Sequence, residues 1–170
     1  MSERSQLPCE VTGCSSGIGA EICRYVSQQG HRVVATARKP ETLSYLEDSP
    51  KVLKLSLDVT SKPSIDAVLN AALEKFGRID VLVNNAGFGL MGVTEALEEK
   101  QMRTLMDTNF WGAANLTREA VRIFRDVNPT SGDIGGVVVQ VSSMGGRITF
   151  PGSSLYHASY VKTPPCAGSD

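Results

Sequence analysis

Short apolar runs rich in β-branched residues alternate with helical patterns along this chain of 170 residues. Such runs suit strands that are covered on both faces, and strands that alternate with helices favour a parallel sheet. The sequence therefore predicts an α/β fold with a doubly wound parallel sheet of about five strands. One predicted strand ends near Thr12, and the others span Arg32–Ala37, Val52–Leu57, Ile79–Val83 and Val137–Val141.

Helical patterns fill the intervals between these runs, at Ile18–Gln29, Glu41–Leu46, Ser64–Phe76, Glu95–Asp107 and Asn109–Val127, with a last helix from Ser154. Gly30 and Gly77 follow two of these helices, where a residue tolerant of positive φ favours helix termination. The Pro- and Gly-containing segment Asn128–Gly136 predicts a surface loop. The length fits one domain, and we find no repeat or interdomain linker.

The first predicted strand contains two residues that suit a central strand poorly. Pro8 lacks the N–H that a sheet ladder needs, and the carboxylate of Glu10 is unfavourable in a buried position. Because a doubly wound sheet places its first strand centrally, we expect these residues to be points of difficulty.

A glycine-rich turn links that strand to the next helix. Residues 12–19 read Thr-Gly-Cys-Ser-Ser-Gly-Ile-Gly, with glycines at Gly13, Gly17 and Gly19. Absent side chains allow a backbone to approach a pyrophosphate, and a helix N-terminus offers free N–H groups. The turn predicts a dinucleotide-binding site that includes Ser15, Ser16 and Ile18. Glycines that only mark a turn are the alternative.

The residue after the second predicted strand bears on cofactor choice. An acid there would bind a free ribose 2′-hydroxyl, but the strand ends in Ala37-Arg38-Lys39. An arginine can hold a 2′-phosphate through paired N–H donors, which a carboxylate would repel. Arg38 therefore predicts NADP(H) rather than NAD(H), with a solvated Arg–Lys pair as the alternative.

Taken in order, the glycine turn, the segment Asn84-Asn-Ala-Gly87, Asn109, Ser143 and Tyr156 resemble the short-chain dehydrogenase/reductase family, from about residue 9 to 159. The resemblance implies a Rossmann-like NADP-binding domain over 1–159. It also implies an oxidoreductase that interconverts a small-molecule carbonyl and an alcohol, and a homo-oligomer. By the same resemblance, the cofactor-binding residues include Asp58, Val59, Asn85, Ala86, Gly87 and Tyr156.

The resemblance assigns the catalytic roles to Asn109, Ser143 and Tyr156. Carbonyl reduction needs a hydride from the nicotinamide and a proton for the developing alkoxide. Ser143 would hydrogen-bond the substrate oxygen, and Tyr156 would supply the proton, helped by a nearby ammonium. Asn109 would bend its helix and hold a water in the proton path. The alternative is an ordinary serine–glycine loop beside a packing tyrosine; His31 and His157 are predicted to be surface or packing residues.

The family pattern breaks off after Tyr156-His-Ala-Ser159. The family has a lysine four residues after the tyrosine, but Tyr160 stands there. Lys162 lies about 120° away from that helix face, and Pro164 and Pro165 stop the helix. We therefore expect a sheet truncated after about five strands, a divergent and disordered tail over 160–170, and impaired catalysis. An alternative splice, a retained intron or a frameshift would produce such a change.

Two alternatives to an impaired enzyme remain. One is a non-catalytic nucleotide-binding or heteromer-forming module that pairs through the Asn109–Val127 helix. The other is a non-functional splice or gene-model product that does not fold stably, since the Val137–Val141 edge would be exposed.

Composition argues against several other classes. A net charge of −1 gives no reason to expect nucleic acid or an anionic membrane as partner. No apolar run approaches the roughly 20 residues that span a bilayer, and Met1–Gln6 lacks the apolar stretch of a signal peptide. The four cysteines show no metal-binding spacing. We therefore expect a cytoplasmic protein with free thiols and no metal.

Overall fold

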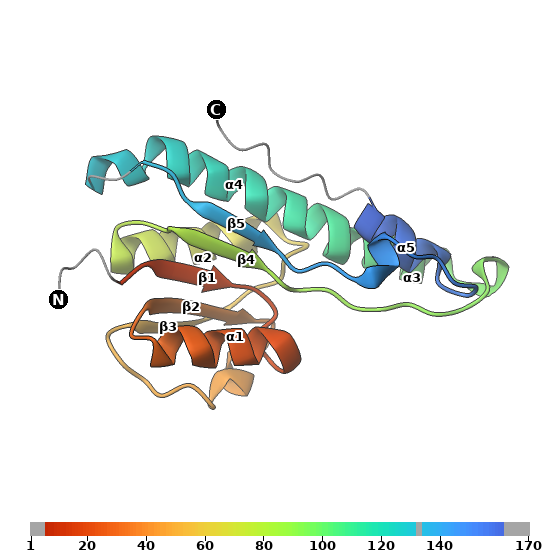
Figure 1. Ribbon diagram of the computed structural model, residues 1–170, viewed down its shortest axis with the longest axis horizontal. Helices are drawn as coiled ribbons and strands as arrows, with labels where there is room; N and C mark the ends of the chain where they lie inside the picture. The colour runs from red at the N-terminus through yellow and green to blue at the C-terminus, as the bar shows by residue number, and fades with distance from the viewer. Residues whose placement is uncertain (1–5, 132–133, 162–170) are drawn as a thin grey trace.

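The computed structural model describes residues 6–131 and 134–161. Five parallel strands form one sheet in the order β3-β2-β1-β4-β5, with helices on both faces (Figure 1). The predicted Rossmann-like fold is confirmed. The strands are β1 (Pro8–Val11), β2 (Arg32–Ala37), β3 (Val52–Ser56), β4 (Val81–Asn84) and β5 (Val137–Gln140).

The helices lie close to their predicted places, with differences at the ends. They are α1 (Gly17–Gln28), α2 (Lys62–Phe76), α3 (Glu99–Met106), α4 (Ala113–Asp126) and α5 (Ser154–Val161). The Ser61 side chain caps the start of α2, and Gly77 ends it at φ 76°. The helix expected at Glu41–Leu46 is only a 3-10 turn, Pro40–Leu43. A capping box between Glu98 and Gln101 starts α3 later than predicted.

Two hydrophobic cores cover the two faces of the sheet. The larger packs α2 and α4 against one face, with Ile65, Leu69, Leu116 and Ile123 among its fully or almost fully buried side chains. The smaller packs α1 against β1, β2 and β4 on the other face. On that second face β5 is poorly covered, since Val137 is 56% exposed and Val139 42% exposed.

The unfavourable first strand nevertheless forms at the centre of the sheet. Pro8 is its first residue, where the missing N–H is tolerated, and its carbonyl accepts from Asp80 N. Glu10 is fully buried, and neither carboxylate oxygen has a hydrogen-bond partner. Desolvation raises the pKa of Glu10 to about 7. The central strand thus carries an uncompensated acid.

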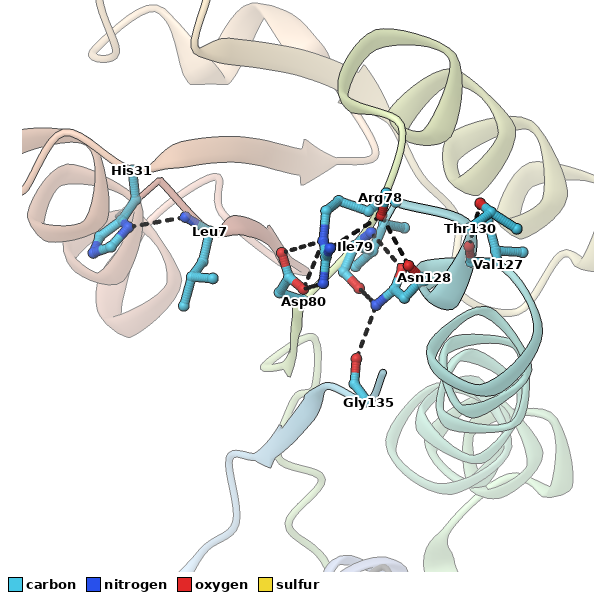
Figure 2. A network of polar contacts seen from close by, with 10 residues as sticks. Leu7, His31, Arg78, Ile79, Asp80, Val127, Asn128, Thr130 and Gly135 are labelled. Carbon is cyan, nitrogen blue, oxygen red and sulfur yellow. Dashed lines mark hydrogen bonds and ion pairs between the residues drawn. The ribbon is translucent and has the colours of Figure 1, made fainter. Parts of the chain in front are cut away.

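Polar contacts tie the elements together at the amino end of the sheet (Figure 2). The Asn128 amide donates to the carbonyls of Ile79 and Gly135 at 2.7 and 2.9 Å. Arg78 pairs with Asp80 just before β4. The predicted loop after α4 therefore begins as a 3-10 turn, Asn128–Ser131, which is fixed to the residues just before β4 and β5.

The predicted tail lies mostly outside the described residues. Its first two residues, Tyr160 and Val161, continue α5. Lys162 and the two prolines fall beyond the part of the chain that the structure describes.

Candidate active site

The carboxyl ends of β1, β4 and β5 bring the predicted site segments together. In Figure 1 these strands point toward the end of the molecule where α3 and α5 lie. Parallel α/β sheets bind ligands at this edge.

Glycine is required at two positions of the first turn. Gly13 has φ 69°, and a Cβ there would lie 2.8 Å from Ala86 Cα. A Cβ at Gly19 would lie 2.5 Å from both the Gly13 carbonyl oxygen and Asn85 Nδ2. The turn is thus pressed against the segment that follows β4.

Thr12 joins the same two segments by hydrogen bonds. Its hydroxyl accepts from the N–H groups of Asn85 and Ala86, both at 2.9 Å. The Asn85 amide donates back to the carbonyls of Thr12 and Gly13 at 2.8 and 3.1 Å. Sequence reasoning placed Thr12 in the motif but gave it no role. A hydroxyl residue directly after the first strand and before Gly13 was the available signal.

The N-terminal turn of α1 opens to solvent beside these contacts. Ser15, Ser16, Gly17 and Ile18 are exposed, and Gly17 has φ 59° with open space around its Cβ position. The first N–H groups of a helix lack intrahelical acceptors and lie at the positive end of its dipole. This end of α1 has the chemistry of an anion site.

Arg38 and Asp58 lie after β2 and β3 on the same edge. Both are exposed. Hydrogen bonds from the hydroxyl and the N–H of Thr60 lower the pKa of Asp58, and the Arg38 charge adds to the effect. By contrast, Val59 is buried, and a Cβ at Gly112 would lie 2.8 Å from its Cγ2. The Val59 side chain therefore faces the core.

Ser143 and Tyr156 come from opposite sides of a glycine. The Ser143 hydroxyl accepts from Gly145 N–H at 3.1 Å, at the start of a 3-10 turn, Met144–Gly146. A Cβ at Gly145 would lie 2.9 Å from Tyr156 Cε1. The structure thus brings the predicted pair to adjoining positions after β5 and on α5.

Asn109 lies in a π-helical segment, Asp107–Gly112, between α3 and α4. Its amide donates to the Phe88 carbonyl at 2.9 Å and to Ser159 Oγ at 3.1 Å, and its oxygen accepts from Phe88 N–H. The helix is distorted at this residue, which links the segment after Gly87 to α5.

Tyr160 occupies the same face of α5 as Tyr156. Their ring centroids are 5.0 Å apart in an edge-to-face arrangement. A Cβ at Gly87 would lie 3.0 Å from Tyr160 Oη and 3.2 Å from Asn109 Oδ1. Burial, with a smaller effect from Tyr156, raises the pKa of Tyr160 to about 12. This position therefore holds a neutral phenol at neutral pH.

His157 has partners that sequence reasoning missed. It is buried, its Nδ1 lies 2.8 Å from the Gly145 carbonyl oxygen, and its Nε2 accepts from Phe150 N–H at 3.1 Å. Both partners are backbone groups, which leave no signature in a sequence. The prediction of a packing residue without a matching partner was incomplete.

Comparison with known proteins decides the family. The family model described as short chain dehydrogenase matches residues 9–161. The chain is 46% identical over 154 residues to Oxidoreductase calM of Penicillium decumbens, covering 88% of this chain and 50% of that protein. It is 35% identical over 149 residues to a 3-ketodihydrosphingosine reductase of Bacteroides thetaiotaomicron, covering 88% and 51%. The chain belongs to the short-chain dehydrogenase family.

Solved structures of short-chain dehydrogenases agree. One from Streptomyces avermitilis superposes with a TM-score of 0.83 at 37% identity, covering 94% of this chain and 57% of that one. A 3-ketoacyl-(acyl-carrier-protein) reductase from Brucella melitensis, complexed with NADH, gives 0.83 at 26% identity, covering 91% and 64%. The chain spans about half the length of the curated relatives it matches.

Short-chain dehydrogenases are oxidoreductases that use NAD(P)(H), and the turn of this chain fits that cofactor. Gly13 and Gly19 let the turn pack against Asn85 and Ala86, and the open space at Gly17 leaves room for a ligand at the backbone. The exposed first turn of α1 supplies N–H donors. Among the described residues, no cluster of His, Cys, Asp and Glu could hold a metal ion. No helix in the described part is long and apolar enough to cross a membrane.

Proposed function

We propose that this short-chain dehydrogenase chain binds NADP(H) in preference to NAD(H), and that its site is built to interconvert a small-molecule ketone and an alcohol. The observation that carries the proposal is the Gly13–Gly19 turn packed on Asn85 and Ala86, beside the open end of α1. Arg38, exposed after β2, supports the preference for a 2′-phosphate. In this proposal 1–159 is the cofactor-binding domain, in the cytoplasm.

In the proposed reaction the Gly13–Gly19 turn and the open end of α1 would hold the cofactor, which would supply or accept the hydride. Ser143 donates a hydrogen bond to the substrate oxygen and keeps its proton, since its hydroxyl oxygen accepts from Gly145 N–H and its O–H can still donate. Tyr156 exchanges the proton with the substrate oxygen. Asn109 fixes α5 to the segment after Gly87 through Ser159 and Phe88, and so holds Tyr156 over the cofactor side. Two relatives named as reductases of keto compounds support a carbonyl substrate.

Tyr160 sets the expected limit on turnover. A lysine ammonium at this position would favour the tyrosinate and strengthen proton transfer, whereas the neutral phenol brings no charge. General acid–base help is worth about 10²–10⁴-fold. Tyr156 keeps its own part of that help, so we expect the missing charge alone to lower turnover by up to about tenfold. The same observation favours the second candidate function, a nucleotide-binding module without turnover that pairs with other chains through α4.

Titration of the purified chain with NADPH and with NADH tests the proposal. A charge-assisted contact to phosphate is worth about 1.5–3 kcal/mol, which corresponds to roughly a 10- to 100-fold preference for NADPH. Arg38→Asp should reverse the preference, while the matched change Lys39→Asp should alter it far less. Equal affinities would refute the NADP(H) assignment. NADH is included in the titration because the Brucella relative is complexed with it. Binding without reduction of any ketone would select the second candidate, and failure to bind either cofactor would favour a non-functional product.

A further inference from the structure

His157 bridges the two segments that carry the reacting groups. It follows Tyr156 on α5, and it contacts the backbone of the Met144–Gly146 turn and of Phe150. Resting on the proposed function, we infer that His157 is a positioning residue that fixes the Ser143 hydroxyl relative to Tyr156. It acts through Gly145 and touches no reacting atom.

Gly145 is the link between the two side chains. Its N–H donates to Ser143 Oγ at 3.1 Å, and its carbonyl lies 2.8 Å from His157 Nδ1. A Cβ on Gly145 would lie 2.9 Å from the Tyr156 ring and 3.0 Å from His157 Nδ1. The residue that orients the serine hydroxyl is thus held between the tyrosine and the histidine, with no room for a side chain of its own.

The hydrogen bonds select one tautomer of the imidazole. Nε2 accepts from Phe150 N–H at 3.1 Å, so Nδ1 carries the proton and donates to the Gly145 carbonyl. With a proton on both nitrogens, the ring could no longer accept the hydrogen bond from Phe150 N–H. Its Nε2 would instead donate to the Phe150 carbonyl oxygen, 3.3 Å away. The Phe150 ring packs edge-to-face against the imidazole, with the ring centroids 4.6 Å apart, and so restricts the orientation of the imidazole.

The other histidine of the chain provides an internal contrast. His31 Nδ1 accepts from Leu7 N–H at 3.2 Å, far from the site at the amino end of the sheet (Figure 2). This contact requires the proton on Nε2. The two histidines of the sequence are therefore expected in opposite tautomers when both are neutral.

Nitrogen-15 NMR of the purified chain tests the inference without cofactor or substrate. At a pH where both rings are neutral, His157 should show the Nδ1–H pattern and His31 the Nε2–H pattern. An Nε2–H pattern for His157 would overturn the inference.

Substitutions then test the link to Ser143. Ser143→Ala should move the Gly145 amide resonance upfield, because its acceptor is lost, and His157→Phe should move it in the same direction. His157→Asn has a side-chain amide that can replace the Nδ1 donor. It should return the Gly145 amide resonance to its original position, but not that of Phe150. His157→Gln, which can replace the Nε2 acceptor, should do the reverse. If the Gly145 amide resonance moves in Ser143→Ala but not in His157→Phe, the inference is overturned. This holds even if His157→Phe is less stable than the unmodified chain.

Kinetics separates this inference from the proposed function. With NADPH and a ketone, His157→Phe should lower kcat by about 10- to 100-fold with little change in KM, since a displacement of order 1 Å costs about 10²-fold. Wild-type kcat in this variant would contradict a positioning role. If the unmodified chain shows no turnover, the proposed function fails, while the NMR result still decides the placement of Ser143.

Discussion

The cofactor half and the catalytic half of this site are built in different ways. The cofactor half comprises the turn after β1 and the segment after β4. Glycines allow the two backbones to approach each other, and hydrogen bonds of Thr12 and Asn85 join them. The catalytic half, after β5 and on α5, depends on the chemistry of single side chains. In our proposal, backbone contacts from several residues make up the cofactor half, whereas turnover in the catalytic half depends on the side chain at position 160. The comparison predicts separable effects on binding and turnover.

The largest effect is expected at Gly19. Gly19→Ala forces a Cβ to within 2.5 Å of backbone, and overpacking costs about 1–3 kcal/mol or more. We expect NADPH affinity to fall by at least about 100-fold, which corresponds to about 2.7 kcal/mol, in a titration followed by fluorescence. Gly77→Ala is the control: Gly77 has a positive φ, 76°, but there is open space around its Cβ position, so the substitution strains the backbone without a clash. It should lose about 1 kcal/mol of stability and keep its affinity. Equal loss of affinity in both would break the comparison.

Glu10 weakens β1, the strand that leads into the cofactor half. Its folded-state pKa of about 7 exceeds the ordinary value of 4.5, so the folded chain retains a proton that the unfolded chain releases. The free energy of unfolding therefore falls as pH rises from about 4.5 to 7, by about 3 kcal/mol in all. Glu10→Val should be more stable than the unmodified chain by about this amount above pH 7, measured by urea unfolding.

The pH dependence of that difference is its control. The gain from Glu10→Val should shrink at pH 4, where the carboxyl is neutral in both states. Glu10→Gln should flatten the pH profile without the full gain, because a buried amide still lacks partners. A difference that does not change with pH would show that ionisation of Glu10 is not its cause.

A smaller effect is expected at Thr12. Thr12→Val keeps the shape but leaves the N–H groups of Asn85 and Ala86 without their acceptor. An unsatisfied buried donor costs about 1–3 kcal/mol, so we expect about 2 kcal/mol less stability and roughly tenfold weaker NADPH binding. Thr36→Val, which removes a single hydroxyl bond to the Val11 carbonyl, should cost less. If Thr12→Val and Thr36→Val lose the same free energy of unfolding, the hydrogen bonds between Thr12 and the segment after β4 contribute little to stability.

The smallest gain is expected from Tyr160→Lys. It restores a positive charge one turn after Tyr156, yet we expect less than about a tenfold rise in turnover, well below the 10²–10⁴ of full acid–base help. Replacing residues 160–170 with the C-terminal half of a full-length relative should raise NADPH-dependent ketone reduction much more. Both proteins should be assayed together on one panel of ketones. A point variant as active as the graft would place the whole deficit at Tyr160.

The sequence predicted the parts of the fold that local patterns determine. The β2 bounds agree residue for residue, and α2 ends at Phe76 because Gly77 follows it. β4 begins two residues later than predicted. Ile79 exchanges hydrogen bonds with the Asn128 side chain, and Arg78 donates to Ser131 (Figure 2). These contacts join segments about fifty positions apart, so no local pattern could reveal them.

The same distinction holds within the candidate site. Ser143 and Tyr156 lie on either side of Gly145, 13 positions apart in the motif that led us to pair them. The contacts of Asn109 with Phe88 and of His157 with Gly145 were missed, since both partners are backbone groups, which leave no signature in a sequence. The sequence indicated that a buried Glu10 would be unfavourable. That its carboxylate has no hydrogen-bond partner could be known only from the elements packed around it.

The strand order also determines when this protein can fold during synthesis. β1 lies between β2 and β4, so its second edge stays open until Val81–Asn84 has been made. The Thr12–Asn85 contact joins residues 73 positions apart. At about 5–20 residues per second, the ribosome needs roughly 4–15 s to cover that interval. During this time a nascent chain exposes an unpaired strand with a charged residue at its centre, and the acid that weakens the finished core discourages neighbouring chains from pairing with that edge.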